Sequence, residues 1–158
     1  MKLKLIAPIL CCMFTSLITN AQKAAMSVYG ELGGPGLASV NFDTRFQKTN
    51  GGLGGRIGVG GIAIDQSSIL FIPVGINYLA GKDDKNFFEL GAGFTYVNAK
   101  DKESLTSESF ESSFGHLWIG YRLQPKDGGV TFRAGINPVF GNGFFIPYYA
   151  GLSIGYKF

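Results

Sequence analysis

His116, the only histidine of the chain, is the side chain best suited to transfer a proton near neutral pH. Serines precede it closely in the sequence, at Ser107, Ser109, Ser112 and Ser113. A serine that a neighbouring histidine deprotonates is a common hydrolase nucleophile, provided that the two side chains lie within hydrogen-bonding distance. In an extended strand alternate residues share a face, which places His116 with Trp118 and Arg122. We therefore expect a packed, hydrogen-bonded histidine, no catalytic residue and no enzymatic activity.

Two other patterns match known chemical sites only loosely. The stretch Gly58–Ala63 (GVGGIA) has the spaced glycines of a dinucleotide-binding loop, but no helical pattern follows it. Acidic side chains between residues 98 and 112 offer oxygen ligands for a divalent cation, namely Asp101, Glu103, Glu108 and Glu111. Their spacing differs from that of a calcium-binding loop, so a solvated acidic loop is the favoured alternative. The sequence predicts neither a cofactor nor a metal.

The N-terminal residues have the pattern of a secretory signal peptide. Two lysines, at positions 2 and 4, precede the uncharged run Leu5–Ile18, and short side chains occupy the cleavage-site positions before Gln22. We predict that residues 1–21 are removed and that residues 22–158 form one domain. A membrane helix is a weaker interpretation, because the run is shorter than the ~20 residues that span a bilayer.

Composition narrows the class of protein further. Cleavage removes the only cysteines, Cys11 and Cys12, so the mature chain has no thiol nucleophile, disulfide or thiolate metal site. It leaves twelve basic and eleven acidic residues, and the formal charge falls from +3 to +1. This charge gives no reason to expect a nucleic-acid partner. The 24 glycines are spread along the predicted strands and are not clustered in linkers, which is typical of strands whose backbones approach closely or curve tightly.

Turn-forming residues divide the mature chain into extended segments of about ten residues, with no helical periodicity. We predict eight strands, at residues 25–33, 37–47, 53–64, 69–79, 87–97, 113–123, 130–140 and 148–158. The turns at 47–52, 80–86 and 124–129 are short, whereas the loop at 98–112 is long, polar and acidic. In an antiparallel meander, the three short turns lie at the same end as both termini, and the long loop lies at the opposite end. Pro73 and Pro138 each remove a ladder donor, so we expect a bulge or a strand end near each.

Each predicted strand has one apolar face and one face that mixes glycine with charge. We assign the apolar faces to the outside, because the interior of a narrow barrel needs glycine to make room for large side chains. Charges in so small a space must pair, since an unpaired buried ion costs several kcal/mol. We predict a closed interior with an ion-pair network, in which Glu31 and Glu89 accept from Arg56, Arg122 or Arg133. The full predicted set is Glu31, Asp43, Arg45, Arg56, Glu89, Arg122 and Arg133.

The chain resembles the small eight-stranded outer-membrane barrels of the OmpA transmembrane-domain and OmpX type. It is most similar to a group of uncharacterised secreted barrel proteins, through Glu31–Gly36 (ELGGPG), Tyr121–Gly129 (YRLQPKDGG) and the last residues, GLSIGYKF. The resemblance implies an all-β, eight-stranded antiparallel up-and-down transmembrane β-barrel in the bacterial outer membrane. It also implies that the barrel assembly machinery reads the apolar face of the last strand, which carries Leu152, Ile154, Tyr156 and Phe158.

From these observations we expect a monomeric barrel, surrounded by outer-membrane lipid, with a structural or surface-interaction role. Its external loops, above all residues 98–112, would carry any contact with a partner, whose identity the sequence does not define. Two alternatives remain open at this point. One is a narrow pore, which needs a continuous water path through the interior. The other is a soluble, lipocalin-like carrier of an apolar ligand, whose aromatic faces would point inward.

Overall fold

The computed structural model describes residues 24–64, 67–101 and 109–158, so the predicted signal peptide (1–21) lies outside the described residues. No helix long and apolar enough to cross a membrane occurs in this part of the chain. The described residues contain strands and connecting turns only. The strands are β1 (Met26–Gly33), β2 (Ala38–Arg45), β3 (Gly52–Ile64), β4 (Ser67–Ala80), β5 (Asn86–Asp101), β6 (Ser109–Leu123), β7 (Gly129–Ile136), β8 (Val139–Gly141), β9 (Phe144–Ile146) and β10 (Ala150–Lys157).

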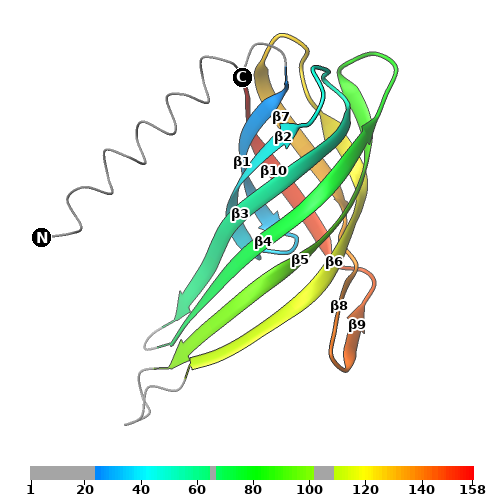
Figure 1. Cartoon of the computed structure of the whole chain (residues 1–158). Helices are drawn as coiled ribbons and strands as arrows, with labels where there is room; N and C mark the ends of the chain where they lie inside the picture. Colours follow the sequence, from blue (N-terminus) through cyan, green and yellow to red (C-terminus); the bar gives the residue numbers. More distant parts are fainter. Residues whose placement is uncertain (1–23, 65–66, 102–108) are drawn as a thin grey trace, which may run out of the picture.

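The strands form one antiparallel sheet that closes into an eight-stranded barrel (Figure 1). β1 to β7 follow one another around the wall, and β10 pairs with both β7 and β1. The closing ladder runs from Ser27 opposite Lys157 to Gly33 opposite Gly151. Closure satisfies the backbone groups that an open sheet would leave at its edges. The predicted fold class and the predicted order of strands are thus confirmed.

The two ends of the barrel differ. The turns between β2 and β3, β4 and β5, and β6 and β7 lie together with the C terminus at one end, which we call the turn end (Figure 1). At the other end, the loop end, β5 and β6 continue beyond their predicted limits, and their ladder reaches Lys100 opposite Ser109. The prediction of a loop over all of 98–112 was therefore wrong at both of its ends. A polar sequence does not prevent pairing there, because the ladder joins backbone groups.

The two prolines within strands have different consequences. β7 ends at Ile136 and β8 begins at Val139, so Pro138 interrupts the strand as predicted. β8 nevertheless pairs with β6 in the register that β7 would have reached. At Pro73 the prediction was wrong, because β4 neither ends nor bulges there. Only its ladder to β3 is interrupted, between the pairs Ile57–Val74 and Gly60–Phe71.

A short hairpin stands at the loop end where the sequence predicted only a connection. β8 and β9 pair through Phe140 opposite Phe145, and β9 has no second neighbour in the sheet. Figure 1 shows this hairpin beside β6, outside the outline of the closed wall. The turn contains Gly143, whose φ of +81° is accessible to glycine at little cost. The Asn142-Gly143 pair between apolar residues is the sequence signal for such a hairpin.

The two faces of the wall have opposite polarity. Charged side chains point inward, and Glu89 and Arg122 are each 0% exposed. Large apolar side chains point outward, with Ile154 64% and Phe94 56% exposed. A soluble carrier of an apolar ligand needs the reverse arrangement, so the structure contradicts that alternative. An apolar outer surface of this extent requires an apolar environment around it.

Glycine lets the strands of this narrow barrel approach one another. A Cβ added to Gly120 would lie 2.8 Å from the Cα of Gly135 on the paired strand, and the reverse also holds. Both glycines face the interior, where the next inward residues of the same strands are Arg122 and Arg133. The missing side chains therefore let the backbones of β6 and β7 approach each other here.

Candidate functional site

Ionisable side chains from six strands converge in the half of the barrel nearest the turn end. Each comes from an inward position of its strand, because alternate residues of a strand point to the same side. Each is at most 6% exposed. They are the seven residues that the sequence singled out: Glu31 of β1, Asp43 and Arg45 of β2, Arg56 of β3, Glu89 of β5, Arg122 of β6 and Arg133 of β7.

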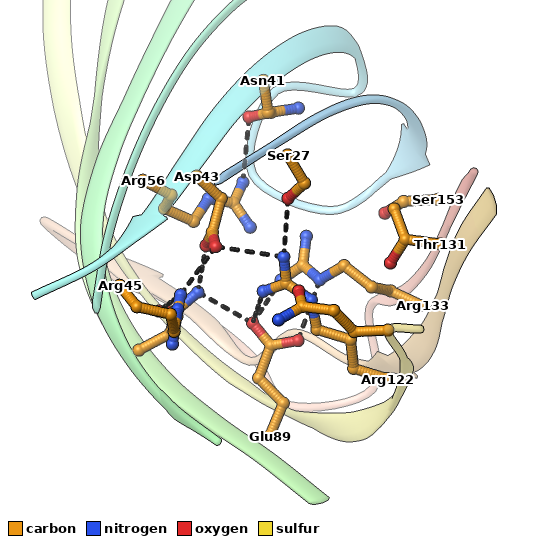
Figure 2. A network of polar contacts seen from close by, with 12 residues as sticks. Ser27, Asn41, Asp43, Arg45, Arg56, Glu89, Arg122, Thr131, Arg133 and Ser153 are labelled. Atoms are coloured by element: carbon orange, nitrogen blue, oxygen red, sulfur yellow. Dashed lines mark hydrogen bonds and ion pairs between the residues drawn. The ribbon is translucent and has the colours of Figure 1, made fainter. Parts of the chain in front are cut away.

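Two glutamates each lie between two arginines. Figure 2 shows one of them, Glu89, beside Arg122 and Arg133. Arg133 donates to Glu89 twice, from Nη2 to Oε1 at 2.8 Å and from Nε to Oε2 at 2.9 Å. Nη1 of Arg122 lies 3.7 Å from Oε1 of Glu89. Glu31 accepts from Nη2 of Arg56 at 3.0 Å and from Nη1 of Arg133 at 3.2 Å. Arg133 therefore connects the two glutamates.

Asp43 extends this pattern towards the turn end. Its Oδ1 accepts from Nη2 of Arg45 at 2.6 Å and from Nη2 of Arg122 at 3.0 Å. Each carboxylate thus has two guanidinium partners, and the seven groups form a single alternating sequence of charge. We call this arrangement the charge chain, in the order Arg56, Glu31, Arg133, Glu89, Arg122, Asp43, Arg45.

Neutral side chains add further hydrogen bonds to the charge chain. Asn77 of β4 donates from Nδ2 to Asp43 at 2.6 Å and to Glu89 at 2.9 Å. Ser153 donates to Glu31 at 3.2 Å, and Arg122 donates to Oγ of Ser27 at 2.8 Å. None of these three residues was predicted as part of the network, because the only signal for them in the sequence is their place on the polar face of a strand.

Arg133 is also held between two aromatic rings. Its guanidinium carbon lies 4.6 Å from the ring centroid of Tyr29 and 4.6 Å from that of Trp118. Cation–π contacts of a desolvated guanidinium are worth up to about 2 kcal/mol each. The rings therefore offset part of the free energy that burying this charge requires.

A second set of contacts closes the turn end. Nδ2 of Asn50, in the β2–β3 turn, donates to the carbonyl oxygens of Gln124 at 3.0 Å and of Asp84. Nε2 of Gln124 donates back to the carbonyl oxygen of Asn50 at 2.7 Å. These bonds join all three turns. Leu79 and Phe87, next to these turns, are each 2% exposed.

The structure does not bring His116 together with Ser112 or Ser113, the two candidate serines whose side chains it describes. His116 is buried, and its Nδ1 lies 3.3 Å from the hydroxyl of Thr95. Ser112 is four residues away along β6, roughly 13 Å at the rise of a strand. Ser113 is exposed, and Ser107 lies outside the described residues. The glycine-rich stretch beginning at Gly58 is part of β3, and a further strand follows it.

The described residues contain no group of three or more histidine, cysteine or acidic side chains arranged to hold a metal ion. Of the acidic residues near the long loop, Asp101 and Glu111 belong to β5 and β6, whereas Glu103 and Glu108 lie outside the described residues. The residues assigned to the assembly signal lie on the outward face of the last strand and at its end. They are Leu152, Ile154, Tyr156 and Phe158, each more than half exposed.

The fold and the charged interior define the class of protein, a small closed eight-stranded barrel with an apolar outer face. Solved structures of outer-membrane barrels share this fold, as the sequence resemblance predicted. The N-terminal β-barrel domain of Pseudomonas aeruginosa OprF is 12% identical, with a TM-score of 0.62 over 87% of this chain and 98% of that one. Ail, the attachment invasion locus protein of Yersinia pestis, is 12% identical, with a TM-score of 0.52 over 85% of this chain and 96% of that one. At these identities the likeness concerns the fold alone.

Ail also has a structure in complex with the heparin analogue sucrose octasulfate, which matches with a TM-score of 0.51 and 14% identity over 85% of this chain and 96% of that one. No family model matches the chain. No curated protein matches it either.

Proposed function

We propose that this protein is an integral outer-membrane barrel whose interior is plugged and which acts through its external surface, without catalysis. The observation that carries the proposal is the pairing of an uncharged, apolar outer face with an interior filled by charged side chains. The signal-peptide pattern predicts export, and closed barrels are the form in which strands cross a bilayer. The turn end would then face the periplasm and the loop end the exterior.

Aromatic side chains on the outer face support this orientation. Tyr78, Phe88, Tyr121 and Tyr156 all point outward and lie within two residues of the turn end of their strands. At the loop end, the paired Phe140 and Phe145 are both exposed. Two aromatic girdles that flank an apolar band are the usual arrangement of transmembrane barrels.

The charge chain supports a plugged interior. Four arginines and three carboxylates occupy the cross-section near the turn end, and each is at most 6% exposed. An interior of eight strands is just wide enough for side chains to fill it. We therefore expect no steady conductance. A narrow pore is the alternative, and it requires the charge chain to leave a continuous path for water.

The external surface would carry the interaction with a partner. It comprises the β8–β9 hairpin, with Phe145 and Tyr148 exposed, and the loop that joins β5 to β6. Ail, which shares the fold, has been crystallised with a heparin analogue. We assign no particular partner to this chain. We propose a monomer that is inserted by the barrel assembly machinery, for which the last strand supplies the signal.

The proposal is tested by fractionating bacteria that express residues 1–158, followed by electrophoresis of the membrane fraction with and without boiling. We expect the protein in the outer membrane, with a mobility that changes on heating because a closed barrel resists detergent. Recovery of a soluble protein would refute the membrane location. Planar-bilayer recordings of the refolded protein then separate the two interiors, because steady single-channel openings would refute the plug and favour the pore.

A further inference from the structure

We infer that the interior binds one small monovalent anion, of about the size of chloride, next to Arg56 at one end of the charge chain. The site is a cavity of about 10 Å³ lined by Arg56, Arg133, Asn77, Glu89, His116 and Trp118. A cavity of this volume holds one particle of about the size of a water molecule. The cavity lies among the inward-facing side chains of the barrel. The inference therefore does not rest on the proposed location of the protein in the cell.

The charges of the charge chain do not balance. The charge chain begins and ends with arginine, so its four guanidinium groups face only three carboxylates. One positive charge is therefore left over in an interior from which water is largely excluded. An uncompensated buried charge costs several kcal/mol, and a bound anion removes that cost.

The position of the surplus charge follows from the two ends of the charge chain. At one end, Arg45 donates from Nη1 to the carbonyl oxygen of Gly52 at 3.0 Å and from Nη2 to the amide oxygen of Asn77. At the other end, Arg56 shares its only carboxylate, Glu31, with Arg133 and donates from Nη2 to the amide oxygen of Asn41 at 3.3 Å. Arg56, Arg133 and Glu89 line the cavity and Arg45 does not, so the surplus positive charge that lies beside the cavity is that of Arg56.

Two of the residues that line the cavity have a buried donor without a partner. Nε of Arg56 and Nε1 of Trp118 are buried, and neither has a hydrogen-bond partner among the described residues. The other unpaired donors of the charge chain belong to Arg45 and Arg122, which do not line the cavity. Buried N–H groups are nearly always paired in folded proteins. Both side chains line the cavity, and an anion that accepts from both would extend the alternating order of the charge chain by one negative group. A water molecule could accept these bonds too, but it would leave the charge uncompensated.

Trp118 makes the inference directly testable, because it is the only tryptophan in the chain. Bromide quenches indole fluorescence on contact, and Trp118 is only 2% exposed to bulk solvent. We would titrate the refolded mature chain in detergent micelles with sodium bromide against sodium gluconate at constant ionic strength. Bound bromide gives quenching that saturates and that chloride reverses. Quenching that rises linearly, or that chloride leaves unchanged, would overturn the proposal and leave water as the occupant.

Two variants locate the site. Arg56→Gln removes the charge and the free donor at the cavity, and we expect the bromide affinity to fall at least tenfold. Arg45→Gln removes one charge at the opposite end of the charge chain, and we expect a smaller, at most threefold, change. Equal affinities in the two variants would refute the assigned position.

A measurement on the unaltered chain covers the case in which the variants fail to refold. A ligand that binds only the folded state raises the midpoint of unfolding in proportion to the logarithm of its concentration. We therefore expect the urea midpoint to rise with chloride concentration when gluconate maintains the ionic strength. A midpoint that is the same in both salts would overturn the proposal.

Discussion

Replacing Glu89 with glutamine is the sharpest test of how the charge chain stabilises the barrel. The carboxylate is 0% exposed and accepts two hydrogen bonds from Arg133 and one from Asn77, with Arg122 at 3.7 Å. Glutamine has nearly the same shape but no charge, so two guanidinium groups lose a counter-ion in a buried place. Breaking a buried ion pair in this way costs about 3–5 kcal/mol. We expect the Glu89→Gln variant to lose that much free energy of unfolding.

The assay is urea unfolding of the refolded protein in detergent micelles, followed by the fluorescence of Trp118, whose ring lies 4.6 Å from the guanidinium of Arg133. The matched control is Lys126→Gln. Lys126 lies 3.8 Å from Asp84, and the two side chains are 71% and 55% exposed. Exposed pairs contribute about 0–1 kcal/mol, so this variant should unfold nearly like the unaltered chain.

A second substitution separates loss of charge from loss of packing. In the double variant Glu89→Gln with Arg133→Met, the unpaired guanidinium between Tyr29 and Trp118 is replaced by an apolar side chain. Replacing a whole buried pair costs less than breaking it, so the double variant should recover at least about 1 kcal/mol relative to Glu89→Gln. If Glu89→Gln is destabilised no more than Lys126→Gln, the reasoning about buried pairing in this barrel is wrong.

Three further predictions concern other parts of the molecule. Gly155→Ala should lose about 1–3 kcal/mol of unfolding free energy in urea, because the added Cβ would overlap the backbone of Val28. In the control Gly30→Ala the added Cβ has one contact, at 4.0 Å, so the unfolding free energy should change little. Equal losses in the two variants would contradict this. Hydrogen bonds from the side chain and backbone of Asn86 lower the pKa of the Asp83 carboxyl to about 2. The stabilising effect of this carboxylate is therefore present above pH 4 and lost as the pH falls towards 2. NMR titration of the carboxyl checks this, and an ordinary pKa near 3.8 would refute it. Asn50→Ala should remove about 1–3 kcal/mol and speed hydrogen exchange at the amide of Gln124, and unchanged exchange there would show that the three turns are not coupled.

Much of the fold could be predicted because the strands of such a barrel alternate between apolar and polar residues with a period of two. Alternation in segments such as Ile154-Gly155-Tyr156 determines which residues face inward, whatever strand lies alongside. Closure of the sheet then depends on the pairing of the first strand, β1, with the last, β10. Apart from the bulge or strand end expected at Pro73, the errors occurred where alternation carries no information, at the polar ends of β5 and β6 and in the Asn142-Gly143 hairpin. In those places the backbone ladder, rather than side-chain polarity, decides where a strand ends.

The sequence by itself determined that seven charged residues share the interior, because parity along each strand depends only on local geometry. It limited the partners of Glu31 and Glu89 to three arginines, Arg56, Arg122 and Arg133, but it could not determine which arginine meets which carboxylate. Asp43 pairs with Arg122, 79 residues away in the sequence, and Asn77 joins Asp43 to Glu89. These contacts form only because the register of each strand pair places the residues at the same height in the barrel. Register is a property of the whole closed sheet. The alternating order of the charge chain, its surplus arginine and the cavity beside Arg56 were therefore decided by the tertiary structure alone.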